Sequence, residues 1–148
     1  MYVAVINRYK KDTYTIGVVK NFGINHGALA STVGHDSHNI TIVYDNPKNA
    51  LLALQQLIKQ KGGFCAIEDG KVIASLELPV AGLMSDESIN VIVDKITKMN
   101  KANVRLGNTY IDNPISRITI LSLLVCPYVK ISDKGNVLTE EKKYVPLF

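Results

Sequence analysis

The sequence predicts an α+β fold in a single layered domain, residues 1–148, with a mixed, mostly antiparallel sheet covered by two or three helices. Short β-branched segments alternate with turns rich in glycine and asparagine, which predicts strands. Two longer segments instead show apolar residues at helical spacing. A chain of 148 residues can bury one hydrophobic core, and no linker-like segment or internal repeat divides it.

The first third of the chain predicts strands. Residues 2–6 and 13–19 are rich in β-branched and aromatic side chains, and the intervening "NRYKKD" suits a hairpin turn. In "NFGINHGALAST", Gly23 and Gly27 surround a short apolar stretch, which predicts turns. The apolar residues of "NITIVYD" (39–45) recur with a period of two, so this segment is expected to form the next strand.

A helix and a hairpin follow. Asn46 is a good N-cap, Pro47 suits the first helical position, and Gly62 ends a segment with apolar residues at helical spacing. "GFCAIEDGKVIASLELPV" predicts a hairpin that turns at Asp69 and Gly70, because glycine adopts a positive φ without a steric cost.

A second helix is expected after "AGLMSDES", with its N-cap near Ser85 or Asp86. Apolar residues then recur on one helical face: Ile89, Ile92, Val93, Ile96 and Met99. The apolar run Ile118–Val125 is compatible with a buried helix or a central strand, because periodicity does not decide at that length. The turn "SDKGN" and a short strand end the chain.

Charge, cysteines and hydropathy exclude several classes. The net charge is +4, but the lysines form short scattered clusters rather than a basic stripe with aromatic residues, so nucleic-acid binding is not expected. Cys65 and Cys126 lie in separate apolar runs, which suits buried thiols in a reducing compartment. The start lacks the order of a signal peptide, and no apolar run approaches the roughly 20 residues of a membrane span. We expect a cytoplasmic protein.

The polar segment "STVGHDSHNI" is the strongest candidate site. His35, Asp36 and His38 are ligand types for a divalent metal, but a catalytic site needs three converging ligands, and the spacing is not that of H-E-x-x-H. No metal site is therefore expected in this chain. The alternative is a polar turn in which Asp36 and Ser37 cap backbone N–H groups and Asn39 forms an Asx turn. The local residues leave both a functional loop and a simple turn open.

Two other polar groups have simpler explanations. Ser85, Asp86 and Glu87 match the preference of helix N-termini for capping and acidic residues. Residues 7–9 follow the first predicted strand and are most simply a turn. The glycine-rich loops match neither a P-loop nor G-x-G-x-x-G.

Three blocks together resemble the C-terminal domain of bacterial and archaeal adenine deaminases: "GALASTVGHDSHNITIV", "GGFCAIEDGKVIASLELPVAGLMSD" and "LLVCPYVKISDKG". The blocks occur in the same order in that family, and the resemblance covers nearly the whole chain. Thr32 and Gly34 in "STVGH" depart from the family pattern, and "NPISRITILSL" is more divergent.

The resemblance implies that the complete enzymes are similar to metal-dependent amidohydrolases. In these a (β/α) barrel holds divalent metal (manganese, iron or zinc), and metal-bound hydroxide converts adenine to hypoxanthine and ammonia. A barrel of about 250 residues does not fit in this chain, and no H-x-H motif occurs. We therefore expect this chain alone to be inactive, with no cofactor of its own, and to have the barrel domain as its partner; the sequence also allows a homo-oligomer.

Two main hypotheses follow from the resemblance. In the first, the domain shapes or covers the barrel active site, with His35, Asp36 and His38 in catalytic roles. Substrate-binding roles then fall to Ser37, Asn39, Ser85 and Asp86. In the second, the domain is purely structural and the polar loop only docks it to the barrel. A third hypothesis, a free-standing metal-dependent hydrolase, requires metal bound to this chain.

Overall fold

The computed structural model describes residues 1–9, 12–108 and 114–147. The described strands are β1 (Tyr2–Ile6), β2 (Tyr14–Val18), β3 (Ala28–Ser31), β4 (Ile40–Tyr44), β5 (Gly63–Glu68), β6 (Lys71–Glu77), β7 (Val129–Ser132), β8 (Gly135–Leu138) and β9 (Lys143–Val145). The described helices are α1 (Pro47–Lys59), α2 (Ile89–Arg105) and α3 (Pro114–Thr119). In the part of the chain described, no helix is both long and apolar enough to cross a membrane.

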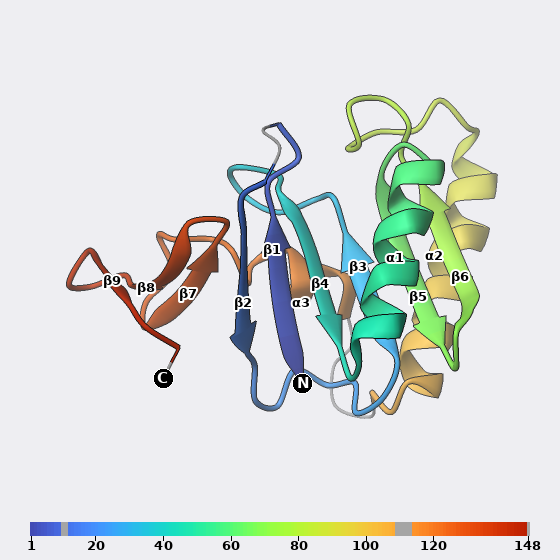
Figure 1. Cartoon of the computed structure of the whole chain (residues 1–148). Helices are drawn as coiled ribbons and strands as arrows, with labels where there is room; N and C mark the ends of the chain where they lie inside the picture. Colours follow the sequence, from blue (N-terminus) through green and yellow to red (C-terminus); the bar gives the residue numbers. More distant parts are fainter. Residues whose placement is uncertain (10–11, 109–113, 148) are drawn as a thin grey trace.

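Six strands form the main sheet in the order β2-β1-β4-β3-β5-β6, and β7-β8-β9 form a second, smaller sheet (Figure 1). Each pairing among the described strands is antiparallel. The predicted α+β class is therefore confirmed. Antiparallel pairing also places the end of β1 beside the start of β4, and the end of β3 beside the starts of β4 and β5. Loops that are distant in sequence consequently meet at one edge of the sheet.

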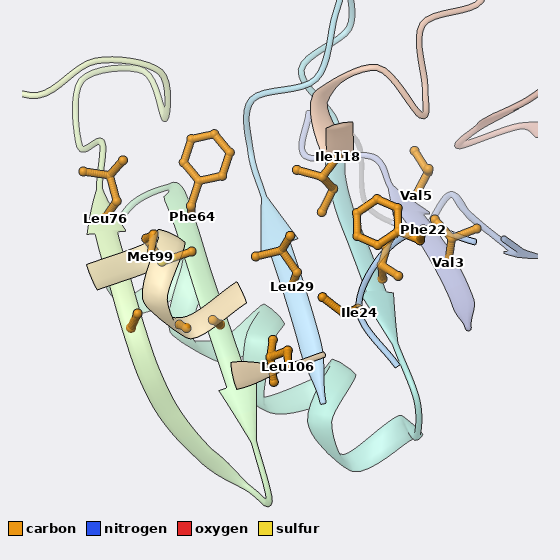
Figure 2. Packing of buried hydrophobic residues seen from close by; sticks show 14 of the residues in the cluster. Val3, Val5, Phe22, Ile24, Leu29, Phe64, Leu76, Met99, Leu106 and Ile118 are labelled. Atoms are coloured by element: carbon orange, nitrogen blue, oxygen red, sulfur yellow. The ribbon is translucent and has the colours of Figure 1, made fainter. Parts of the chain in front are cut away.

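The main sheet has a hydrophobic core on each face. On one face α1 packs over β3, β4 and β5, with Ala53 and Leu57 against Ile42 and Ile67. On the other face α2 packs on β5 and β6, while α3 packs on β3 and β4. Figure 2 shows this second core, in which Met99 and Leu106 of the α2 side and Ile118 of α3 converge with side chains from the strands.

The predicted start of α1 and the predicted hairpin are confirmed; the helix ends at Lys59, three residues before the predicted stop at Gly62. The Asn46 side chain accepts a hydrogen bond from the Asn49 N–H at 3.1 Å, and Pro47 is the first helical residue. Strands β5 and β6 turn at Asp69 and Gly70, which both have positive φ. This is the backbone that a tight two-residue hairpin requires.

The central strand β3 was not predicted. β3 has the sequence "ALAS", all four residues are buried, and it pairs with β4 on one side and β5 on the other. Alanine and serine have low strand propensity, so nothing local identifies the segment. Their small size suits a central strand with α1 on one face and α3 on the other.

The predicted start of α2 is wrong. The helix begins at Ile89 after Ser88, whereas the Ser85 hydroxyl accepts a hydrogen bond from the Glu87 N–H in a separate turn. A backbone bridge between Val80 and Met84 closes another turn just before this one. The predicted apolar face is buried only in part: Met99 lies in the core, whereas Ile89 and Val93 are exposed.

The run Ile118–Val125 is neither a continuous helix nor a strand. It begins at the end of α3, where Ile118 is fully buried, and continues through turns. Val125 is 80% exposed. An apolar composition was therefore a poor guide to burial at this end of the chain.

Candidate functional site at the polar edge of the sheet

Three segments meet where the strands of the main sheet end on one side: residues 7–9 and 12–13 between β1 and β2, residues 32–39 between β3 and β4, and residues 78–88 after β6 (Figure 1). We call this the polar edge. It includes the sequence-predicted residues 35–39, and the antiparallel topology brings them to Arg8 and to the 78–88 segment.

The backbone of the β3–β4 loop is held at several points. The His35 N–H donates to the Thr119 carbonyl at 3.2 Å, which ties the loop to α3. The His38 N–H donates to the Gly34 carbonyl at 2.5 Å, and the Gly34 N–H donates to His38 Nδ1 at 3.4 Å. A Cβ at Gly34 would lie only 3.2 Å from Ser122 Oγ, so a residue without a side chain allows this close approach.

The side chains of the same loop point outward. His35, Asp36 and Ser37 are exposed. The side chains of Asp36 and Ser37 form no hydrogen bond or ion pair with the residues that the structure describes. A fixed backbone therefore carries polar side chains that are available to a partner or ligand.

The two histidines lie against each other. The rings of His35 and His38 meet edge to face, with centroids 5.6 Å apart. Partial burial, and then the positive charges of His35 and Arg8, lower the pKa of His38 below its ordinary value of 6.5; Asp36 opposes this shift. At pH 7 His38 is therefore neutral, as its role as acceptor for the Gly34 N–H requires.

The lowered pKa of His38 predicts a pH-dependent stability. His38 binds a proton less readily in the folded state than in the unfolded state, where the pKa of its side chain is 6.5. The contribution of His38 is therefore complete above pH 6.5, and it is lost as the pH falls through the lower folded pKa. We expect the free energy of unfolding of the wild type to fall more steeply below pH 6.5 than that of His38→Asn, since asparagine tolerates the positive φ of +51° at this position.

Urea denaturation of both proteins between pH 5 and 8 measures this difference. Parallel curves for the wild type and His38→Asn would show that His38 does not contribute. Titration of the His38 ring by NMR would give its pKa directly.

Asn39 has a different environment from the rest of the loop. Only 3% of it is exposed, and its Nδ2 donates to Asp133 Oδ1 at 3.0 Å. Asp133, in the β7–β8 turn, also accepts from Asn7 Nδ2 at 2.8 Å and from the Thr13 hydroxyl at 3.3 Å. The Asp133 carboxylate thus joins the β1–β2 and β3–β4 segments of the polar edge to the second sheet. No local signal in the sequence indicates this role of Asp133.

Thr32 joins the loop to the 78–88 segment. Its hydroxyl donates to the Gly82 carbonyl at 2.6 Å and accepts from the Gly63 N–H at 2.7 Å. The guanidinium of Arg8 packs directly against Gly82 and donates to the Tyr9 hydroxyl at 3.0 Å. Arg8 was interpreted from the sequence as part of a turn, but the structure brings it to the candidate site.

Ser85 and Asp86 lie in the 78–88 segment, and Asp86 is exposed. In the described residues neither side chain forms a hydrogen bond with residues 32–39; the connection between the two segments runs through Gly82 and Thr32. The structure therefore brings His35, His38 and Arg8 together more closely than it does the two residues predicted beside them.

The described residues do not suit a metal ion. Across residues 1–9, 12–108 and 114–147, no group of three or more His, Cys, Asp or Glu side chains is placed to hold one. What the polar edge does offer is a cation at Arg8, a carboxylate at Asp36 and imidazoles at His35 and His38. These groups donate and accept hydrogen bonds and exchange protons.

The fold and the polar edge define a class: an antiparallel α+β domain that presents hydrogen-bonding side chains from loops at one edge of its sheet. The chain belongs to the adenine deaminase C-terminal domain family, whose profile matches residues 1–143. The resemblance drawn from the sequence motifs is thus confirmed.

Among its relatives is the adenine deaminase of Thermosipho melanesiensis, 41% identical over 146 residues, which cover 99% of this chain and 25% of that protein. Adenine deaminase 1 of Agrobacterium fabrum is 45% identical over 136 residues, or 91% of this chain and 24% of the relative. The Borreliella burgdorferi adenine deaminase is 42% identical over 134 residues, which cover 90% of this chain and 24% of that protein. The chain spans about a quarter of the length of these relatives.

Proposed function

We propose that this chain acts as the accessory domain of an adenine deaminase and presents its β3–β4 loop to the active site formed by the rest of the enzyme. The reaction is the hydrolysis of adenine to hypoxanthine and ammonia. The proposal is supported by the family to which the chain belongs and by relatives named adenine deaminase. The amidohydrolase-type barrel expected in the rest of the enzyme is the partner.

One observation carries this proposal: the β3–β4 loop combines a fixed backbone with outward polar side chains. Its main chain is tied to α3 through His35 and closed on itself through His38. A loop that only connects two strands needs no such ties for exposed side chains. Functional groups, in contrast, must be held in place to act on a substrate.

The chemistry of the loop suits a purine and its reacting water. The exposed His35 and Asp36 can orient or transfer a proton, and the Ser37 hydroxyl can donate to or accept from a purine edge. Neutral His38 holds the turn that carries them. In this proposal Ser85 and Asp86 supply further polar contacts from the neighbouring segment. Because the described residues do not suit a metal, the metal expected in this family would be held by the barrel.

A structural role is the second candidate, and a different observation favours it. Asn39 and Asp133 are committed to hydrogen bonds within the domain, so part of the polar edge serves the fold. In a purely structural domain, changes to His35 and Asp36 would alter stability or assembly and leave catalysis intact.

A cytoplasmic location remains our prediction, and both Cys65 and Cys126 are free thiols.

The test needs a complete enzyme. We expect that, in a chimera in which this chain replaces the C-terminal quarter of the Thermosipho melanesiensis adenine deaminase, His35→Ala and Asp36→Ala each lower kcat/KM for adenine at least about tenfold. The physical reason is the loss of a positioned acid–base group beside the substrate. Ammonia release measures the rates.

His26→Ala is the matched control. His26 precedes the start of β3, at the strand ends remote from the polar edge, where it hydrogen-bonds to Glu68. Its loss should therefore leave kcat/KM unchanged. Near-normal kcat/KM in both His35→Ala and Asp36→Ala would rule out the proposed contribution. If both variants are instead less stable at normal kcat/KM, the structural role is favoured.

A further inference from the structure

We propose that the uncovered face of β1 and β2 is the surface by which this domain docks on the preceding part of the adenine deaminase. This inference rests on the proposed function, and it names the contact that the proposed function requires. The surface, here called the β1–β2 face, consists of residues from both strands whose side chains lie on the α1 side of the sheet: Tyr2, Ala4, Ile6, Tyr14, Ile16 and Val18.

Strand register places these side chains together. Tyr2 pairs with Val18, Ala4 with Ile16, and Ile6 with Tyr14. Paired residues of antiparallel strands project to the same face, so the three pairs form one contiguous surface. Large parts of it are open to solvent: Tyr2 is 49% exposed, Tyr14 64%, Ile16 42% and Val18 57%.

The opposite face of the same strands is covered. Val3 and Val5 are buried in the same hydrophobic core as Phe22 and Ile118. Gly17 leaves room for the second sheet, because a Cβ there would lie 3.0 Å from Ile131 Cδ1 and from Asn136 Oδ1. In Figure 1 α1 lies over the middle of the main sheet, to one side of β1 and β2.

The composition of the β1–β2 face is that of an interface. When one face of an antiparallel sheet is in water, its residues are normally polar. Here the face carries tyrosines and β-branched residues, and tyrosine is enriched in protein interfaces because its ring is apolar and its hydroxyl is polar. The exposed Tyr2 ring also stacks on the buried Tyr44 ring of β4, with centroids 5.7 Å apart, which holds Tyr2 in place on this face.

The occupant follows from the position of the face. The family is a C-terminal domain, and the relatives are about four times longer, so most of their chain precedes the part that corresponds to this domain. In the relatives that preceding part leads into the segment that corresponds to β1. Here Met1 is held to the end of β2 by hydrogen bonds in both directions with Val19, at 3.0 and 3.3 Å. At the other end of β1, Ile6 leads directly to Arg8 at the polar edge. A partner on this face would therefore extend along β1 from its start to the candidate site.

Cysteine labelling tests this docking. Ile16→Cys is compared with Val72→Cys. Ile16 lies on β2 and Val72 on β6, the two outermost strands of the main sheet, and the two native residues are exposed to similar extents, 42% and 39%. Cys126→Ser removes the partly exposed native thiol, while burial raises the pKa of Cys65 to about 12 and keeps it unreactive. Each variant is treated with a maleimide, both as the 148-residue chain and within the Thermosipho melanesiensis chimera.

We expect the thiol of Ile16→Cys to react at least tenfold more slowly in the chimera than in the 148-residue chain, and the thiol of Val72→Cys to react at the same rate in both. Val18→Cys repeats the measurement at a second position of the face. Unchanged rates at both positions 16 and 18 would overturn the docking surface. Slow labelling in the 148-residue chain that speeds up on dilution would assign the face to a second copy and would also overturn it.

The two proposals fail separately. Labelling reports whether the face is covered, whatever the activity of the chimera. The His35→Ala and Asp36→Ala rates report whether the loop contributes to catalysis. A protected thiol in Ile16→Cys, together with normal rates in the loop variants, would leave a docked but purely structural domain.

Discussion

Replacing Gly63 with alanine is expected to lower the free energy of unfolding by about 4 kcal/mol, the range of the most damaging single substitutions. Gly63 begins β5 with a φ of +108°, a conformation that residues with a side chain rarely adopt. A Cβ at this position would overlap the Leu76 carbonyl oxygen and lie 2.8 Å from the Leu78 nitrogen. Both are backbone atoms, so relief requires β5 and β6 to separate.

Gly70→Ala is the matched control for this substitution. Gly70 also has a positive φ, +70°, but a Cβ there would meet nothing within 4 Å at the tip of the hairpin. Only the conformational strain remains, which costs about 1 kcal/mol. Urea denaturation followed by circular dichroism gives both values for the 148-residue chain. Similar losses in the two variants would contradict the backbone clash.

Glycines 62 and 63 also explain why the polar edge can assemble. The Gly63 N–H donates to the Thr32 hydroxyl, which in turn donates to the Gly82 carbonyl. At Gly62 a Cβ would lie 2.5 Å from the Gly82 Cα, so the two backbones approach directly. The loss of Gly63 should therefore disturb the site as well as the sheet.

Features that depend on a few adjacent residues were predictable from the sequence. The N-terminus of α1 is determined by Asn46 and Pro47, and the β5–β6 turn by Asp69 and Gly70. In each case a local hydrogen bond or an allowed φ decides the conformation, and the same residues would decide it in any fold. The "HDSHN" loop was recognised for the same reason, because its polar residues are contiguous.

Features that depend on tertiary contacts were not predictable. β3 is a strand because β4 and β5 pair with it, although its alanines and serine do not favour that state. The expected N-cap near Ser85 or Asp86 was wrong, because the Ser85 hydroxyl accepts from the Glu87 N–H in a separate turn and the helix begins at Ile89. Arg8 and Asp133 lie far from the loop in sequence, so only the topology reveals their place beside it.

Among residues outside the β3–β4 loop, we expect substitution of Asp133 to have the largest effect on that loop. Asp133→Ala removes the acceptor of Asn39 Nδ2, which lies in a residue only 3% exposed, and the acceptor of Asn7 Nδ2. A buried donor left without its charged partner costs about 2 kcal/mol. We expect that loss in the free energy of unfolding, together with faster hydrogen exchange at the His38 N–H.

The neighbouring Lys134→Ala is the control for Asp133→Ala, because Lys134 is exposed in the same turn. If the fixed backbone of the loop matters for catalysis, Asp133→Ala should also lower kcat/KM of the chimera severalfold while every side chain of residues 34–38 is still present. Hydrogen exchange at His38 that matches the Lys134→Ala level would show that Asp133 does not hold the loop. Faster exchange with unchanged kcat/KM would instead show that catalysis does not depend on a fixed loop backbone. The polar edge would then serve the assembly of the enzyme.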